Sequence, residues 1–99
     1  MSAINPAVVM AVVSGEYWTD RQGLVFNSEG EVKIFCEENP KVILLLDGMP
    51  YEIPVRKIVA FEKFGLDAFE CGVKIKHANE DIRDNSYENI IKNKRGKKL

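Results

Sequence analysis

The chain has 99 residues and a net charge of −1, and 45% of its residues are hydrophobic. This length supports one small domain with a single modest core, and the hydrophobic fraction excludes a wholly disordered chain. No apolar run reaches the roughly 20 residues that a membrane-spanning helix needs, and no basic residue precedes the apolar run Ala7–Val13 as it would in a secretory signal. We therefore expect a cytoplasmic protein without membrane association, in which Cys36 and Cys71 are reduced thiols.

Charge is distributed unevenly along the chain. Residues 1–70 contain 6 Lys/Arg and 11 Asp/Glu, whereas residues 71–99 contain 8 Lys/Arg and 4 Asp/Glu. The sequence therefore predicts an acidic scaffold with one basic end, of which residues 92–99 form a basic tail. A frayed, solvated terminus is the simplest structural interpretation of that tail.

The first half of the chain has the patterns of β-strands. The apolar, β-branched run Val8–Val13 is typical of a strand and is followed by a glycine at position 15. Leu24–Phe26 and Val32–Phe35 flank a polar segment that contains a glycine, and together they predict a hairpin.

A second hairpin is predicted after Pro40. Val42–Leu46 and Tyr51–Val55 are separated by Asp47-Gly48, which is a strong turn signal. Pro50 and Pro54 indicate that the returning strand lies at an edge, because proline has no N–H to donate to a sheet.

The pattern becomes helical after this hairpin. Ile58–Phe64 has apolar residues at helical spacing, and Gly65 is a plausible end of that helix. Val73–His77 alternates as a short strand does. A last helix is predicted over residues 87–91, capped by Ser86 or the asparagine before it. The order of elements gives an α+β class.

One segment has residues that suit chemistry. In this order, residues 77–90 contain His77, a turn around Asn79–Asp81, Asn85 and the triplet Glu88-Asn89-Ile90. This segment resembles the core of HNH homing endonucleases of the phage-intron type.

Two upstream segments extend the resemblance. Trp18 and residues 23–33 look like the N-terminal module that such nucleases carry, and residues 55–64 are similar to the helix that follows it. The resemblance is colinear over residues 18–91 and implies a single domain: a strand-rich hairpin module (18–55), a helix with a ββα-metal core (56–91), and the basic tail. It also implies a phage origin, and hence the cytoplasm of the host cell.

The resemblance implies roles for individual residues. His77 would be the general base that takes a proton from the attacking water, a task that suits a near-neutral pKa. Asn85 would fix the loop, and Asn89 would hold a divalent ion, Mg²⁺ or Mn²⁺, that stabilises the transition state. Asp81, which lies close by in the sequence, is predicted as a further ligand of that ion.

Two positions depart from the family pattern. Lys76 stands where the family has a metal-binding Asn or Asp, and Arg56 stands where it usually has a histidine. A protonated ammonium has no lone pair for a metal, and both changes place positive charge where the cation would sit. Both side chains are good phosphate ligands, so the pattern favours phosphate binding over hydrolysis.

Three hypotheses for the function follow, and whether the protein is an enzyme stays open. The first is a DNA-binding protein, derived from an HNH nuclease and impaired in cleavage, that binds phosphates in a salt-sensitive way. Its predicted contacts are basic: Arg56, Lys57, Lys74, Lys76, Arg83, Lys92, Lys94 and Arg95.

The second hypothesis is an active, metal-dependent nicking endonuclease, in which Asn79, Asp81 or Asp84 replaces the lost ligand. The third is a phage-encoded protein that inhibits a host enzyme or regulator through an acidic surface. That surface would contain Glu16, Asp20, Glu29, Glu31, Glu37 and Glu38.

Overall fold

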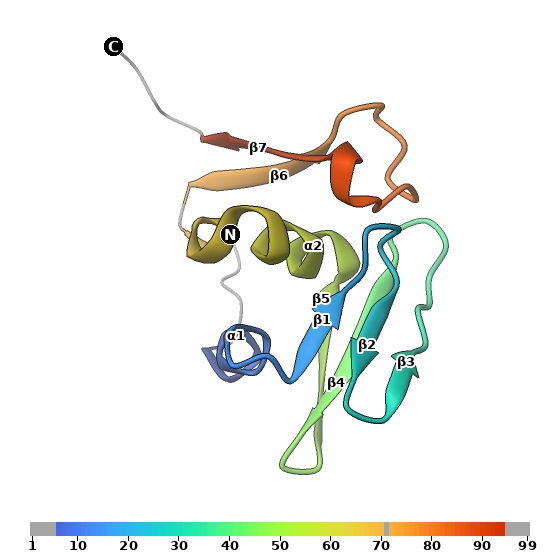
Figure 1. Cartoon of the computed structure of the whole chain (residues 1–99), viewed down its shortest axis with the longest axis vertical. Coiled ribbons are helices and arrows are strands. Elements are labelled where there is room, and N and C mark those ends of the chain that lie inside the picture. Colours follow the sequence, from blue (N-terminus) through green and yellow to red (C-terminus); the bar gives the residue numbers. More distant parts are fainter. Residues whose placement is uncertain (1–5, 71, 95–99) are drawn as a thin grey trace.

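The computed structural model describes residues 6–70 and 72–94 and has the predicted α+β class, with antiparallel hairpins around a helix. Helix α2 (Val55–Phe64) is the central element. It lies between the C-terminal hairpin and the N-terminal half of the chain (Figure 1). Within the described ranges, no helix has the length and apolar character needed to cross a membrane.

Helix α1 (Pro6–Val13) occupies the segment for which the sequence predicted a strand, so that prediction is wrong. Its buried residues, Val8, Ala11 and Val12, share one helical face and pack into the core. Pro6 suits the first helical position because its fixed φ is already helical. Burial of this face outweighs the strand preference of the β-branched residues.

The predicted hairpin of the first half is confirmed within a three-stranded antiparallel sheet. Strand β2 (Val25–Asn27) pairs with β1 (Tyr17–Thr19) on one side and with β3 (Gly30–Val32) on the other. β1 was not predicted. β3 begins and ends earlier than the predicted strand Val32–Phe35, of which only Val32 lies in β3, while Phe35 forms an isolated bridge with Lys41.

The second hairpin, β4 (Lys41–Leu46) and β5 (Met49–Pro54), is confirmed. Asp47 and Gly48 both have positive φ, 54° and 77°, as the type I′ turn of a two-residue hairpin requires. The two strands form a sheet of their own, so β5 is an edge strand, as its prolines predicted.

Helix α2 is confirmed and buries four residues: Val55, Ile58, Val59 and Ala60. It ends at Gly65, which has a φ of 71° and donates its N–H to the Phe61 carbonyl. A 3-10 helix, η1 (Gly65–Phe69), follows and leads toward β6.

Strand β6 (Val73–His77) matches its prediction, but the last helix does not. Tyr87–Asn89 form a single turn of 3-10 helix, η2, and Ile90–Lys94 form strand β7, which pairs antiparallel with β6. Ile90 is fully buried in the core and pairs with His77, which requires extended backbone there. The described residues therefore contain the two strands of the expected ββα motif, and the helix predicted over residues 87–91 is replaced by η2 and the start of β7.

Candidate functional site

A cleft of about 470 Å³ lies between the end of β6 with its following loop and the beginning of α2. It brings together segments that are far apart in the sequence. The residues that line it are Asn39, Arg56, Ile75, Lys76, His77, Glu80 and Ile82. The predicted general base and both of the positions that depart from the family pattern therefore share one cleft.

His77 is held in place by Asn85. The histidine is the last residue of β6 and is 8% exposed, and its Nε2 lies 2.8 Å from Asn85 Oδ1. With the amide oxygen facing the ring, the Nε2–H of a neutral imidazole donates this bond and leaves the lone pair on Nδ1. Asn85 is itself buried, as a residue that fixes a loop should be. Its loop-fixing role stays a prediction.

The loop between β6 and β7 is fastened by side-chain amides. Asn89 Oδ1 accepts the Asn79 N–H at 3.0 Å, while Asn89 Nδ2 donates to Asn79 Oδ1 at 2.9 Å and to the Asp84 carbonyl at 2.7 Å. Ser86 donates its hydroxyl and its N–H to Asp84 Oδ1. These bonds, the hydroxyl first, lower the pKa of Asp84 because they favour its charged form.

Asn89 and Asp81 were predicted to hold a metal ion. The Asn89 amide is used by the loop, and Asp81 Oδ1 accepts the Arg83 N–H and lies 3.6 Å from Arg83 Nε. No cluster of three or more His, Cys, Asp or Glu side chains suited to a metal occurs in residues 6–70 and 72–94. With Arg56 and Lys76 lining the cleft beside a single carboxylate, this set of side chains does not fit a resident divalent ion. The metal-binding roles stay predictions.

Arg56 is oriented by a neutral partner. Its Nη1 donates to Asn39 Oδ1 at 2.8 Å, and burial lowers the pKa of the guanidinium, which still remains protonated at neutral pH. Because an amide carries no charge, this bond fixes the side chain without neutralising it. Sequence reasoning missed Asn39, since nothing in its Asn-Pro context indicated a contact 17 positions along the chain.

The other predicted basic contacts differ in their surroundings. Lys74 and Lys76 project from the same exposed face of β6. Lys57 donates to the Ala68 carbonyl, and Lys92 lies 2.8 Å from Asp67 Oδ2, so both are tied to η1. Burial, and then the charge of Arg56, lower the pKa of Lys57.

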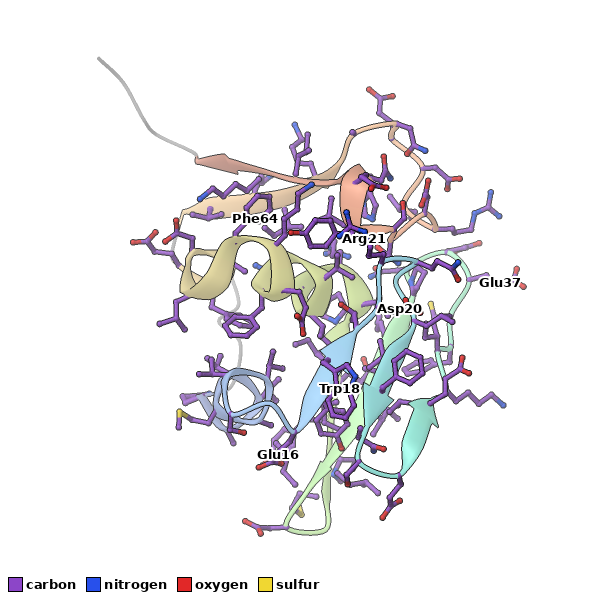
Figure 2. The ribbon with its side chains drawn as sticks, in the orientation of Figure 1. Glu16, Trp18, Asp20, Arg21, Glu37 and Phe64 are labelled. Carbon is purple, nitrogen blue, oxygen red and sulfur yellow. The ribbon has the colours of Figure 1, made fainter. Side chains whose placement is uncertain are left out.

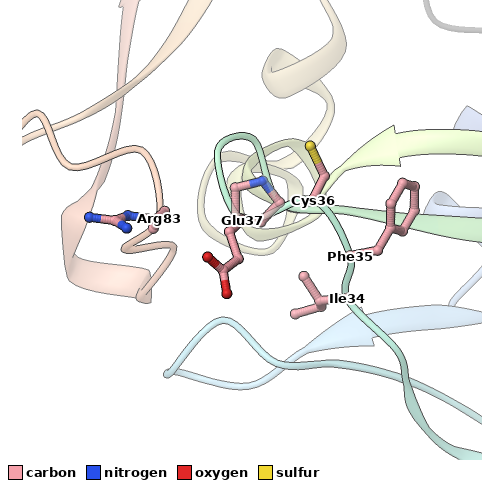
Figure 3. Close-up of a pocket in the computed structure, with 6 residues that line it drawn as sticks. Ile34, Phe35, Cys36, Glu37 and Arg83 are labelled. Atoms are coloured by element: carbon pink, nitrogen blue, oxygen red, sulfur yellow. The ribbon is translucent and has the colours of Figure 1, made fainter.

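Of the three remaining predicted contacts, the structure describes the side chain of Arg83. Arg83 lines a neighbouring cleft of about 430 Å³ beside residues 34–37, and Figure 3 shows the Glu37 carboxylate between it and Ile34. The side chain of Lys94, and Arg95 as a whole, lie outside the described residues.

Lys63 joins the C-terminal hairpin to α2. Its Nζ donates to the carbonyls of Tyr87 and Ile90, each at 2.9 Å, and lies over the rings of Tyr87 and Phe64. These bonds hold η2 and the start of β7, the strand whose first residue, Ile90, pairs with His77. The sequence did not single out Lys63, because both acceptors are backbone carbonyls more than 20 residues away.

The acidic residues of the third hypothesis are spread over different elements. Figure 2 shows Glu16 near the end of α1, Asp20 in the turn after β1, and Glu37 in the loop before β4. Asp20 also has a local structural task, since its Oδ1 accepts the N–H groups of Gln22 and Leu24.

Comparison with known proteins gives a structural likeness. No family model matches the chain, and no curated protein matches its sequence. A solved structure described as "DNA binding and cleavage by the HNH homing endonuclease I-HmuI" is similar, with a TM-score of 0.63 and 19% sequence identity. The likeness covers 77% of this chain and 45% of that one, so this chain spans less than half of the endonuclease's length. At this identity the likeness shows an HNH-like fold.

Proposed function

We propose that this chain is an HNH-type nucleic-acid-binding protein whose cleft holds a backbone phosphate of DNA and whose cleavage activity is impaired. One observation supports the proposal most strongly: the Arg56 guanidinium, oriented by the neutral Asn39, lines the same cleft as Lys76 and His77. A guanidinium that is oriented by a neutral amide keeps its charge, and it is suited to bidentate contact with phosphate.

The chemistry of the cleft favours binding over hydrolysis. Arg56 and Lys76 supply positive charge where a metal-dependent nuclease needs a cation, and Glu80 is the only carboxylate among the described residues that line the cleft. His77 can accept a hydrogen bond or a proton at Nδ1, but a water molecule activated there would lack the cation that stabilises the leaving oxygen. The expected activity is therefore salt-dependent binding with slow cleavage or none.

Binding is tested by fluorescence anisotropy with a labelled DNA duplex over a range of salt concentrations. Arg56→Gln removes the guanidinium from the cleft, whereas the control Lys33→Gln removes one positive charge from an exposed position outside it. We expect Arg56→Gln to weaken binding about tenfold or more, as the loss of a charged hydrogen bond of about 1.5–3 kcal/mol implies. The slope of log K against log salt should fall by about one.

Two outcomes would contradict phosphate binding in the cleft. One is wild-type affinity that does not change with salt. The other is an equal effect of Arg56→Gln and Lys33→Gln, which would indicate a general contribution of charge.

An active nicking endonuclease is the second candidate, and the buried His77–Asn85 pair favours it, because a base with a fixed tautomer is what such chemistry needs. Supercoiled plasmid with Mg²⁺ or Mn²⁺ distinguishes the two candidates. Nicking that is lost in His77→Ala would show that cleavage survives, and intact plasmid alongside salt-sensitive binding supports the impaired form.

A further inference from the structure

The turn between β1 and β2 lies against the segment that fixes His77. The Arg21 carbonyl in this turn accepts the Tyr87 N–H at 2.8 Å, and the Arg21 guanidinium lies 4.7 Å from the centre of the Tyr87 ring. Figure 2 shows Asp20 and Arg21 at this junction, beside the C-terminal hairpin. The N-terminal sheet therefore contacts the residues that immediately follow Asn85.

Gly23 makes the closest approach at this junction. It has a φ of +90°, and a Cβ built on it would lie 2.5 Å from the Asn85 carbonyl oxygen and 2.8 Å from the carbonyl carbon. Both atoms belong to the backbone, so a side chain at position 23 requires the Asn85 segment to move. No other glycine with a described Cβ environment meets a neighbour in this way.

The turn that carries Gly23 is itself fixed by Asp20. One carboxylate oxygen of Asp20 accepts the N–H groups of Gln22 at 3.0 Å and of Leu24 at 2.9 Å, and the Asp20 carbonyl accepts the Gly23 N–H. An aspartate that bonds the backbone two residues on gives the turn a defined shape. A defined turn in backbone contact with Asn85 limits where the Asn85 side chain can lie.

We propose that Gly23 and the turn Asp20–Leu24 are a positioning element for the cleft, acting on His77 through Asn85. Contact at Gly23 holds Asn85 so that its amide oxygen accepts the His77 Nε2–H, which keeps the ring in the tautomer with its lone pair on Nδ1. The inference rests on the proposed function of the cleft, because the turn would orient His77 toward the phosphate that is proposed to bind there. The N-terminal sheet then contributes to the site without lining the cleft.

The test is the tautomer of His77, read from the ¹⁵N chemical shifts of its ring in the labelled protein at mildly alkaline pH. His77 is the chain's single histidine, so the signals need no assignment against others. Gly23→Ala introduces the contact with Asn85. Gly15→Ala is the matched control, because its φ of +88° is almost the same and its Cβ meets nothing within 4 Å.

We expect wild type and Gly15→Ala to show one tautomer, with the proton on Nε2, and folded Gly23→Ala to show a mixture of the two. Asp20→Ala loosens the turn without adding atoms and should give the same change to a smaller extent, so it serves if Gly23→Ala does not fold. A purely structural role would lower the stability of a variant but leave the tautomer of its folded state unchanged. Wild-type ring shifts in folded Gly23→Ala or Asp20→Ala would overturn the inference. Since the readout contains no DNA, a failure of the positioning role can be told apart from a failure of DNA binding.

Discussion

Lys63 carries a large share of the attachment of the C-terminal hairpin to α2, and Lys63→Met tests this. Methionine keeps the apolar stem near the Phe64 and Tyr87 rings but removes the ammonium that bonds the carbonyls of Tyr87 and Ile90 at 2.9 Å. A hydrogen bond to a charged group contributes about 1.5–3 kcal/mol. The site is only partly buried, so water replaces some of this loss. We expect the free energy of unfolding to fall by about 2–3 kcal/mol for the two bonds together.

Urea unfolding followed by circular dichroism measures this free energy. For a domain of this size, a loss of that magnitude lowers Tm by roughly 10–20 °C. The neighbouring substitution Glu62→Gln is the control, because Glu62 is exposed and its loss should change stability by less than about 0.5 kcal/mol. If Lys63→Met were also within about 0.5 kcal/mol of wild type, Lys63 would not attach the C-terminal hairpin to α2 to any measurable extent.

Three further predictions concern the cleft, its loop and the core. Asn39→Ala should weaken DNA binding about 2- to 10-fold in an anisotropy titration, since Arg56 loses its orienting bond of about 0.5–1.5 kcal/mol, and unchanged affinity would argue against that orientation. Ser86→Ala should destabilise the protein at neutral pH, because the depressed pKa of Asp84 stabilises the fold above the ordinary value of 3.8 and this contribution disappears as pH falls through the lower folded value. Urea unfolding at several pH values measures the difference in free energy of unfolding between Ser86→Ala and wild type. A difference that grows as the pH falls would contradict this role of Asp84. Ile90→Ala should lower the free energy of unfolding by about 2–5 kcal/mol in the same assay, as expected for a fully buried side chain, and a loss below about 1 kcal/mol would show that β7 is not part of the core.

Local sequence signals predicted the elements that depend on local chemistry. The Asp47-Gly48 turn, the end of α2 at Gly65 and the bounds of β6 all agree with the structure, because positive φ angles and strand alternation are encoded within a few residues. The two wrong predictions, α1 and β7, are segments whose form is decided by what they pack against. Burial of one helical face decides α1, and pairing of Ile90 with His77 decides β7.

The same distinction applies to the cleft. The resemblance to HNH nucleases singled out His77, Lys76 and Arg56, which the fold brings to one cleft, and Asn85, which lies beside His77. It gave no role to Asn39 or to Gly23, although Gly23 lies in the matched N-terminal segment, since the relevant contact of each is with a residue distant in the sequence. Charge alone could not reveal that Lys57 and Lys92 are tied to η1.

DNA binding at the cleft can be tested by NMR titration of the ¹⁵N-labelled protein with a short duplex at low salt. We predict that the resonances of Asn39, Arg56, Lys76 and His77 shift first and that raising the salt concentration reverses the shifts. Shifts confined to the β1–β2–β3 sheet, with the cleft resonances unmoved, would show that DNA does not bind at the cleft.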